Sequence, residues 1–302
     1  MEPEIDNSSR TILVTGATGY VGGRLVPILI QKGYKVRCLV RDPERLKGRP
    51  WFSKVEAFTG NVLNEESLTK AMEGVDSAYY LIHSMASKGD YAEIDQLAAR
   101  NFSKAAEVNK LKNIIFLGGL AQQSASLSKH LKSRQDTGNA LRVYSTPVTE
   151  FRCAVVVGSG SISFELIRYL SERLPLMVCP RWVYTKTQPI SIKTVLQYLS
   201  AALEKPDCIG KIFEVGSEEV MSYGDMMKKY AKIRGLKRLM IPVPVLTPKL
   251  SSYWVNFVTP IQARIARPLV LSMKNENIIK DFSAREAFPE IIPDSYETAV
   301  TN

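Results

Sequence analysis

Residues 11–23, TILVTGATGYVGG, indicate the fold of the chain. The first five of these residues form a short continuous apolar run, which is typical of a strand buried on both faces of a parallel sheet. Glycines follow at positions 16, 19 and 22, and apolar residues then recur at helical spacing up to Lys32. We therefore predict a strand, a tight glycine turn and a helix that begins directly after the turn.

This glycine turn predicts a dinucleotide-binding site. Glycine provides the positive φ of the tight turn, lets the backbone approach a pyrophosphate, and lets the helix pack closely on the strand. Backbone N–H groups at the start of the helix then point toward the phosphates. The cofactor ligands predicted here are Gly16, Thr18, Gly19, Tyr20, Val21 and Gly22.

Strand-like and helical patterns alternate through the first half of the chain. Strands are expected at 35–40, 55–58, 77–82, 113–117 and 149–157, and helices after Asn64 and at about 91–109 and 126–143. This alternation predicts an α/β fold with a doubly wound parallel sheet, a Rossmann domain over residues 10–160. Residues 161–302 are expected to form a small mixed C-terminal lobe that also supplies a returning strand at about 211–216.

The end of the second strand predicts which dinucleotide is bound. An NAD site carries an acid about 20 residues past the glycine turn, where it accepts a hydrogen bond from the ribose 2′-hydroxyl. No acid lies between Gly16 and Arg41, which follows the strand directly. Because a guanidinium pairs bidentately with a phosphate, we predict NADP(H), with Arg41 on the 2′-phosphate and Arg37 or Arg45 in support. NAD stays open, because Asp42 could turn inward and accept the ribose.

Composition limits the remaining function classes. The four cysteines are far apart and the chain has only two histidines, so neither a disulfide framework nor a metal site is expected. The opening segment has no basic region followed by an apolar one, and we expect no secretory signal and a cytoplasmic protein.

The formal net charge of +10 is concentrated in two basic stretches, 32–54 and the acid-free 228–238. Such clusters favour phosphates, anionic lipid surfaces or nucleic acid. The first is explained by the cofactor, and no recognised nucleic-acid module accompanies the second, so nucleic acid is not expected as a partner. Aromatic and basic residues mix in 246–268, which suits either domain packing or peripheral contact with an anionic membrane.

Taken together, these motifs resemble the short-chain dehydrogenase/reductase superfamily. TGATGYVGG at 15–23, LVRDPERL at 39–46, GNV at 60–62 and TEFRCAVVVGSGS at 149–161 are similar to its extended and atypical branches. HLKSRQDTGNALR at 130–142 and PRWVYTKTQPISI at 180–192 narrow the likeness to NmrA-like and epimerase-related members. The resemblance implies that Asn61 and Val62 flank the adenine. It also implies that Leu81 and His83 run under the ribose and nicotinamide, and that residues 154–158 lie beside the nicotinamide ring.

The chain departs from this superfamily at the proton donor. The reductases use a Tyr four residues before a Lys, and none of the 13 tyrosines here has a Lys at that spacing. His130 and Arg134 occupy the corresponding place, and Gly118 and Gly119 replace the Ser that usually ends strand five. Because imidazole titrates near neutrality, we predict that His130 is the proton donor, with Arg134 holding ribose hydroxyls or an anionic substrate. In the alternative, His130 is a surface residue and Arg134 only grips the cofactor.

These features predict an NADP(H)-dependent oxidoreductase that acts on a small carbonyl or enone compound by hydride transfer, with the proton supplied by His130 or water. A non-catalytic NAD(P)-binding redox sensor or assembly factor of the NmrA-like type is the alternative, and the absent Tyr/Lys pair supports it. The expected partner is a small-molecule substrate. The sequence leaves the identity of that substrate and the oligomeric state open.

Overall fold

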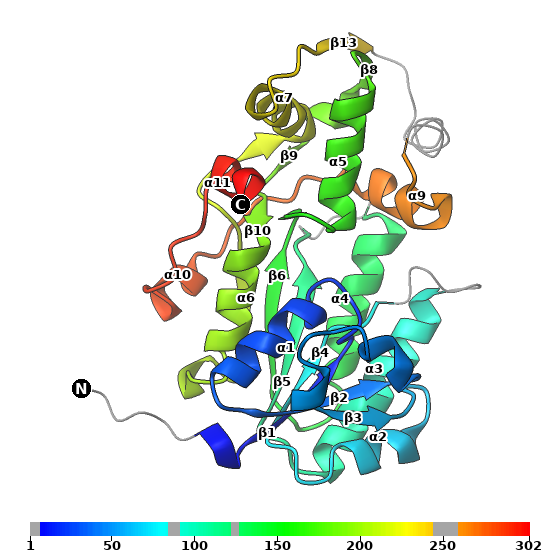
Figure 1. Cartoon of the computed structure of the whole chain (residues 1–302), viewed down its shortest axis with the longest axis vertical. Helices are drawn as coiled ribbons and strands as arrows, with labels where there is room; N and C mark the ends of the chain where they lie inside the picture. Colours follow the sequence, from blue (N-terminus) through cyan, green and yellow to red (C-terminus); the bar gives the residue numbers. More distant parts are fainter. Residues whose placement is uncertain (1–6, 84–90, 122–126, 244–258) are drawn as a thin grey trace.

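The structure, a computed structural model, describes residues 7–83, 91–121, 127–243 and 259–302. A seven-stranded parallel sheet occupies the larger part of the molecule (Figure 1). Its strands lie in the order β11-β6-β5-β4-β1-β2-β3. Their bounds are β1 (Thr11–Thr15), β2 (Lys35–Val40), β3 (Glu56–Thr59), β4 (Ser77–Tyr80), β5 (Asn113–Gly119), β6 (Val148–Cys153) and β11 (Ile212–Val215). The order reverses at β1, as in dinucleotide-binding folds, and confirms the predicted doubly wound sheet.

Helices cover both faces of this sheet. Helices α1 (Gly22–Gln31) and α6 (Ile192–Ala201) pack on one face, and α2 (Glu65–Ala71), α3 (Tyr91–Val108) and α4 (Lys129–Leu141) pack on the other. Successive side chains of a strand point to opposite faces. Ile12 and Val14 of β1 therefore belong to the α1 side of the core, whereas Leu13 belongs to the α2 and α3 side.

The C-terminal lobe consists of short strand pairs and helices above the sheet (Figure 1). The pairs are β7 (Val156–Val157) with β10 (Ile190–Ser191), β9 (Lys186–Thr187) with β12 (Met221–Ser222), and β8 (Leu176–Pro180) with β13 (Leu239–Val243). The helices are α5 (Ile162–Arg173), α7 (Tyr223–Ile233), α9 (Ala263–Ser272), α10 (Ser283–Ala287) and α11 (Tyr296–Thr301). A separate apolar cluster holds most of these elements together, with α5 packed on α7.

The single strand expected over 149–157 is wrong, because the chain leaves the main sheet after Cys153 and β7 pairs with β10 instead. An uninterrupted apolar run does not show where the chain passes from one sheet to another.

Most of segment 246–268, considered for membrane contact, lies outside the described residues, which omit 244–258. Within the described residues, no helix combines the length and apolar character needed to cross a membrane.

Candidate functional site

The predicted glycine turn joins β1 to α1. Gly16 has φ +73°, and a Cβ there would lie 2.5 Å from the carbonyl oxygen of Leu81, beyond the end of β4. A Cβ on Gly22 would lie 2.4 Å from the carbonyl oxygen of Gly16, and the Gly19 N–H donates to that same oxygen at 2.8 Å. Positive φ is therefore needed at Gly16, whereas Gly22 is needed for close packing of the helix on the turn.

Tyr20 and Val21 link this turn to both halves of the molecule. Val21 packs against the apolar core on the α1 side. The Tyr20 ring reaches toward the loop after β7, where a Cβ on Gly158 would lie 2.6 Å from the phenol oxygen. Arg24 stacks on the Tyr20 ring, 4.1 Å from its centroid, and donates to the carbonyl of Ser159 at 2.9 Å. The glycine turn and the segment expected beside the nicotinamide are thus neighbours.

Arg49 is a cation at the turn that the sequence did not single out. Its guanidinium donates to the carbonyl oxygen of Thr18 at 3.2 Å, and a Cβ on Gly23 would lie 3.4 Å from it. A positive charge therefore sits beside the N-terminus of α1, which already favours anions through its unpaired N–H groups. The only signal for Arg49 in the sequence is its membership of the basic stretch 32–54.

Arg41 lies at the carboxyl edge of the sheet, directly after β2. Its side chain is exposed and has no hydrogen bond or ion pair within the described part of the chain. The neighbouring Asp42 carboxylate accepts from the N–H of Glu44 at 3.1 Å and caps the short helix Pro43–Leu46. Because this carboxylate already accepts a backbone hydrogen bond, Asp42 is less available to accept one from a ribose hydroxyl.

Arg37 does not support Arg41. Its guanidinium pairs with Glu56 at 2.8 Å and donates to the carbonyl oxygens of Ala71 and Glu73, near the end of α2. Arg37 lies near the start of β2, so its side chain is close to the amino edge of the sheet, opposite the edge that carries Arg41. Arg45 is exposed near Arg41.

Asn61 and Val62 form the turn between β3 and α2. The Asn61 carbonyl oxygen Oδ1 accepts from the N–H of Leu63 at 3.1 Å, and Val62 packs against the core on the α3 side. The amide of Asn101 in α3 donates to the carbonyl of Val62 at 3.3 Å. The turn is therefore held to the same sheet edge as the glycine turn, and Asn61 keeps an exposed surface there.

The two histidines of the chain meet beyond the ends of β4 and β5. The Nε2 atom of His83, three residues past β4, lies 3.2 Å from Nδ1 of His130 in the first turn of α4. On its other side, Nδ1 of His83 lies 2.8 Å from a carboxylate oxygen of Asp95 in α3. The Asp95 side chain is 2% exposed and that of His83 is 20% exposed. Three elements thus build one chain of contacts, Asp95 to His83 to His130, and the sequence reasoning missed Asp95.

This chain of contacts fixes where protons sit. Burial lowers the pKa of His83 despite its hydrogen bond to Asp95. Burial, together with the charges of His83 and Arg134, lowers the pKa of His130 to about 3. Both rings are therefore neutral near pH 7. A carboxylate accepts only, so the His83 Nδ1–H donates to Asp95 and its Nε2 accepts from the Nδ1–H of His130. The Nε2 of His130 then carries a lone pair and not a proton.

Arg134 lies one helical turn after His130. Its guanidinium donates to the carbonyl oxygens of Ile82 and Leu117 and stacks 4.8 Å above the Phe116 ring. Arg134 thereby links the carboxyl ends of β4 and β5. Burial lowers the pKa of Arg134, yet a guanidinium stays charged at neutral pH. No described carboxylate forms an ion pair with it, and its charge disfavours protonation of both histidines.

A cavity of about 170 Å³ opens between the sheet edge and the C-terminal lobe. Its polar wall includes His130, Arg134 and Cys153, and its apolar wall includes Leu131 and Met273. Burial raises the pKa of Cys153 to about 12, so this thiol is no nucleophile. Ligand pockets for drug-sized molecules measure roughly 300–1,000 Å³. The cavity therefore fits a small compound or one end of a larger one.

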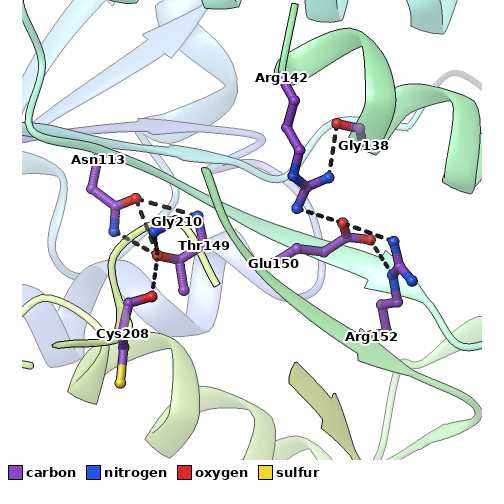
Figure 2. Close-up of polar contacts among 8 residues, drawn as sticks. All are labelled: Asn113, Gly138, Arg142, Thr149, Glu150, Arg152, Cys208 and Gly210. Carbon is purple, nitrogen blue, oxygen red and sulfur yellow. Dashed lines mark hydrogen bonds and ion pairs between the residues drawn. The ribbon is translucent and has the colours of Figure 1, made fainter. Parts of the chain in front are cut away.

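Glu150 explains the absence of a serine at the end of β5. A Cβ on Gly118 would lie 2.4 Å from a carboxylate oxygen of Glu150, which is 1% exposed. Figure 2 shows this carboxylate held between Arg142 and Arg152, each 2.8 Å away. The Glu150 carboxylate, paired with both arginines, fills the space above Gly118. A side chain at position 118 would require this carboxylate to move.

The residues at the sheet edge fit an NADP(H) molecule. Closely packed glycines leave room for a pyrophosphate at the start of α1, and Arg41 offers an exposed guanidinium at the edge where a 2′-phosphate would lie. The Tyr20 hydroxyl is buried with no hydrogen-bond partner among the described residues, as expected of a group beside a ligand site.

Comparison with known proteins agrees with this geometry. Residues 16–145 match the NAD(P)H-binding family. A 3-beta-hydroxysteroid dehydrogenase of Mycolicibacterium neoaurum is 28% identical over 117 residues, which is 39% of this chain and 31% of that protein. The chain thus spans less than a third of the first curated relative it matches. A photosystem II assembly factor Ycf39 of Trieres chinensis is 21% identical over 283 residues, covering 92% of this chain and 87% of that one.

Solved structures agree on the fold over nearly the whole chain. The triphenylmethane reductase of Citrobacter sp., crystallised with NADP(H), superposes with a TM-score of 0.75 at 20% identity, covering 96% of this chain and 99% of that one. At this identity the likeness concerns the fold alone. Residues 16–145 therefore form an NAD(P)H-binding domain, and the chain as a whole has the fold of this NADP(H)-bound reductase.

Proposed function

We propose that the chain is an NADP(H)-dependent oxidoreductase that reduces a small carbonyl or enone compound, with His130 transferring the proton. The observation that carries this proposal is the buried chain Asp95–His83–His130, which ends in a cavity at the carboxyl edge of an NAD(P)H-binding sheet. Open α/β folds bind their ligands at this edge. The bound nicotinamide would supply the hydride.

The histidine pair can hold and release one proton. When the pair gains a proton, His83 becomes an imidazolium that donates to Asp95 from Nδ1 and to His130 from Nε2. His130 then carries its own proton on Nε2, toward the substrate. As that proton passes to the substrate oxygen, the His83 Nε2–H moves onto Nδ1 of His130, and the pair returns to its neutral form. In the reverse direction, the lone pair on His130 Nε2 accepts the proton of an alcohol.

Tyr223 places a phenol on the cavity wall as well. Burial raises the pKa of its phenol to about 12, so this proton is retained at neutral pH. Among the described residues no cation lowers that pKa, in contrast to a Tyr/Lys pair. We assign it a substrate hydrogen bond at most, and Tyr223→Phe serves as the comparison for His130→Gln.

A panel of small aldehydes, ketones, enones and quinones, followed by NADPH oxidation, tests the activity. We expect His130→Gln to lower turnover by roughly 100-fold or more, as general acid catalysis contributes about 10²–10⁴-fold. Tyr223→Phe should change turnover less. If His130→Gln oxidises NADPH as fast as wild type on the best substrate, the proton-transfer role is excluded.

We further propose that NADP(H) is preferred over NAD(H), with Arg41 and Arg49 as the cations near the 2′-phosphate. Loss of a charge-assisted contact from Arg41→Ala should weaken NADPH by about 10- to 100-fold and leave NADH little changed. Lys47→Ala is the matched control, because Lys47 is an exposed cation of the same stretch that already pairs with Glu44 at 2.6 Å. Fluorescence titrations with both dinucleotides give the answer, and equal losses for NADPH and NADH would contradict the assignment.

A second candidate is a non-catalytic NAD(P)-binding sensor or assembly factor. Two observations favour it: the likeness to an assembly factor runs over 92% of the chain, and the Tyr/Lys pair is absent. Tight NADPH binding without consumption of NADPH across the whole substrate panel would favour this candidate.

A further inference from the structure

The strand pair β8 and β13 forms a ribbon at the end of the molecule farthest from the main sheet (Figure 1). The strands are parallel, with Leu176 opposite Leu239 and Val178 opposite Ile241. On the inner face, Met177, Cys179 and Met240 pack with α5 and α7. Because side chains alternate along a strand, Leu176, Val178, Leu239 and Ile241 point outward.

The outward face of this ribbon is apolar and exposed. Leu176 is 48% exposed, Val178 51%, Leu239 61% and Ile241 41%. Isolated exposed apolar residues are common, but four that are paired across two strands form one contiguous patch. No other described strand pairs with the ribbon.

Cations flank this patch. Lys237 comes two residues before Leu239, and Lys228, Lys232 and Arg234 lie on α7 or just after it. These four side chains are exposed, and none has an ion pair or hydrogen bond within the described residues. They account for most of the acid-free stretch 228–238.

The acids at this end of the molecule are already engaged. Glu172 accepts from Tyr230 at 2.6 Å and pairs with Arg168 at 3.2 Å. Asp225 caps α7 through Ser222 at 2.7 Å. Glu172 and Asp225 therefore form no ion pair with these four cations, which remain available to a partner.

We propose that this end of the molecule docks on an anionic lipid bilayer, with the β8–β13 ribbon entering the headgroup region and the α7 cations on the lipid phosphates. Bilayer interfaces accept apolar side chains beside Lys and Arg, because each anionic headgroup attracts the cations and the acyl boundary takes the apolar patch. Nucleic acid would use the cations and leave the four apolar side chains in water. This proposal does not depend on the oxidoreductase function.

Vesicle cosedimentation of the full chain tests the docking. The probes are phosphatidylcholine vesicles, alone or with about 30% phosphatidylserine. Each Lys or Arg near the anionic surface should raise the partition coefficient of the protein by roughly fivefold. We expect binding only to the anionic vesicles, and weaker binding at high salt because the charges are then screened. Lys232→Gln with Lys237→Gln should weaken binding by about 25-fold.

Two further variants separate the contributions. Lys35→Gln with Lys54→Gln changes net charge equally, but Lys35 begins β2 and Lys54 precedes β3, both at the amino edge of the main sheet, and binding should be nearly unchanged. Val178→Ser with Ile241→Ser keeps all charges and should also weaken binding. Retained NADPH affinity shows that each variant is folded.

Three results would overturn the proposal. The first is equal binding to neutral and anionic vesicles, and the second is wild-type binding by the Val178 and Ile241 double variant. The third is binding to double-stranded DNA without binding to anionic vesicles, which would assign the cations to a polyanion.

Discussion

Replacing Asp95 with Asn is the sharpest test of the histidine pair. The amide oxygen of Asn can still accept from His83 Nδ1–H, so the 2.8 Å contact and the packing of α3 can persist. What is lost is the negative charge that stabilises a protonated His83. The proton held by the pair should therefore bind more weakly in Asp95→Asn, and the pKa of the pair should fall further.

The magnitude follows from the type of hydrogen bond that changes. A bond to a charged group contributes about 1.5–3 kcal/mol, against about 0.5–1.5 kcal/mol between neutral groups. The difference of roughly 1–1.5 kcal/mol corresponds to about one pKa unit, at 1.36 kcal/mol per unit. We therefore expect the midpoint for protonation of the pair to fall by about one unit.

The chain is well suited to this measurement because it has only two histidines. Nitrogen NMR of the histidine-labelled, untagged protein reports protonation of each ring nitrogen as the pH is lowered. At neutral pH we expect both rings to carry their proton on Nδ1. Asp136→Asn is the matched control, since Asp136 lies on α4 and accepts from Gln96 of α3 at 3.5 Å. An unshifted midpoint in Asp95→Asn, or a neutral His130 with its proton on Nε2, would refute the reasoning.

Three further predictions concern affinity and stability. Arg49→Ala should weaken NADPH more than NADH, by about 10-fold or more, measured by fluorescence titration. Gly118→Ser should cost about 1–3 kcal/mol in urea unfolding, because its Cβ would lie 2.4 Å from Glu150, whereas Gly119→Ser should cost less, because its Cβ has contacts of 3.4 Å or longer. Acid should destabilise the fold. The pKa of His130 is lowered to about 3 when folded and is near 6.5 when unfolded, so the unfolded chain binds the proton first. The free energy of unfolding should then fall as the pH drops below about 6.5, by up to about 1.4 kcal/mol per pH unit from this group, and His130→Gln should remove that part of the slope.

The parts of the fold that rest on local patterns could be predicted from the sequence. The run 11–15, the glycine turn and the alternation after it define β1, α1 and the parallel order of the sheet, because each depends on neighbours along the chain. The ribbon of β8 and β13 could not be predicted, since Leu176 and Leu239 are far apart in the sequence. They are brought together by the packing of α5, which precedes β8, on α7, which precedes β13.

The candidate site divides in the same way. Arg41 could be singled out because the role proposed for it depends on its position at the end of β2. Asp95 could not, because a carboxylate on a helix is ordinary, and its contact with His83 depends on how α3 packs in the folded chain. Arg49 belonged to a basic stretch, and nothing in its spacing indicated a contact with Thr18.

The two departures from the superfamily pattern fit together. A phenol needs a nearby cation to release its proton, whereas an imidazole needs a nearby anion to hold one. Arg134 supplies a buried cation on the helix of His130, and Asp95 supplies a buried anion that reaches His130 only through His83. In the proposed mechanism the proton is therefore stored on His83, which does not line the cavity, and His130 passes it on. Because that mechanism uses the protonated pair for reduction and the neutral pair for oxidation, it predicts opposite pH dependence for the two directions of the reaction.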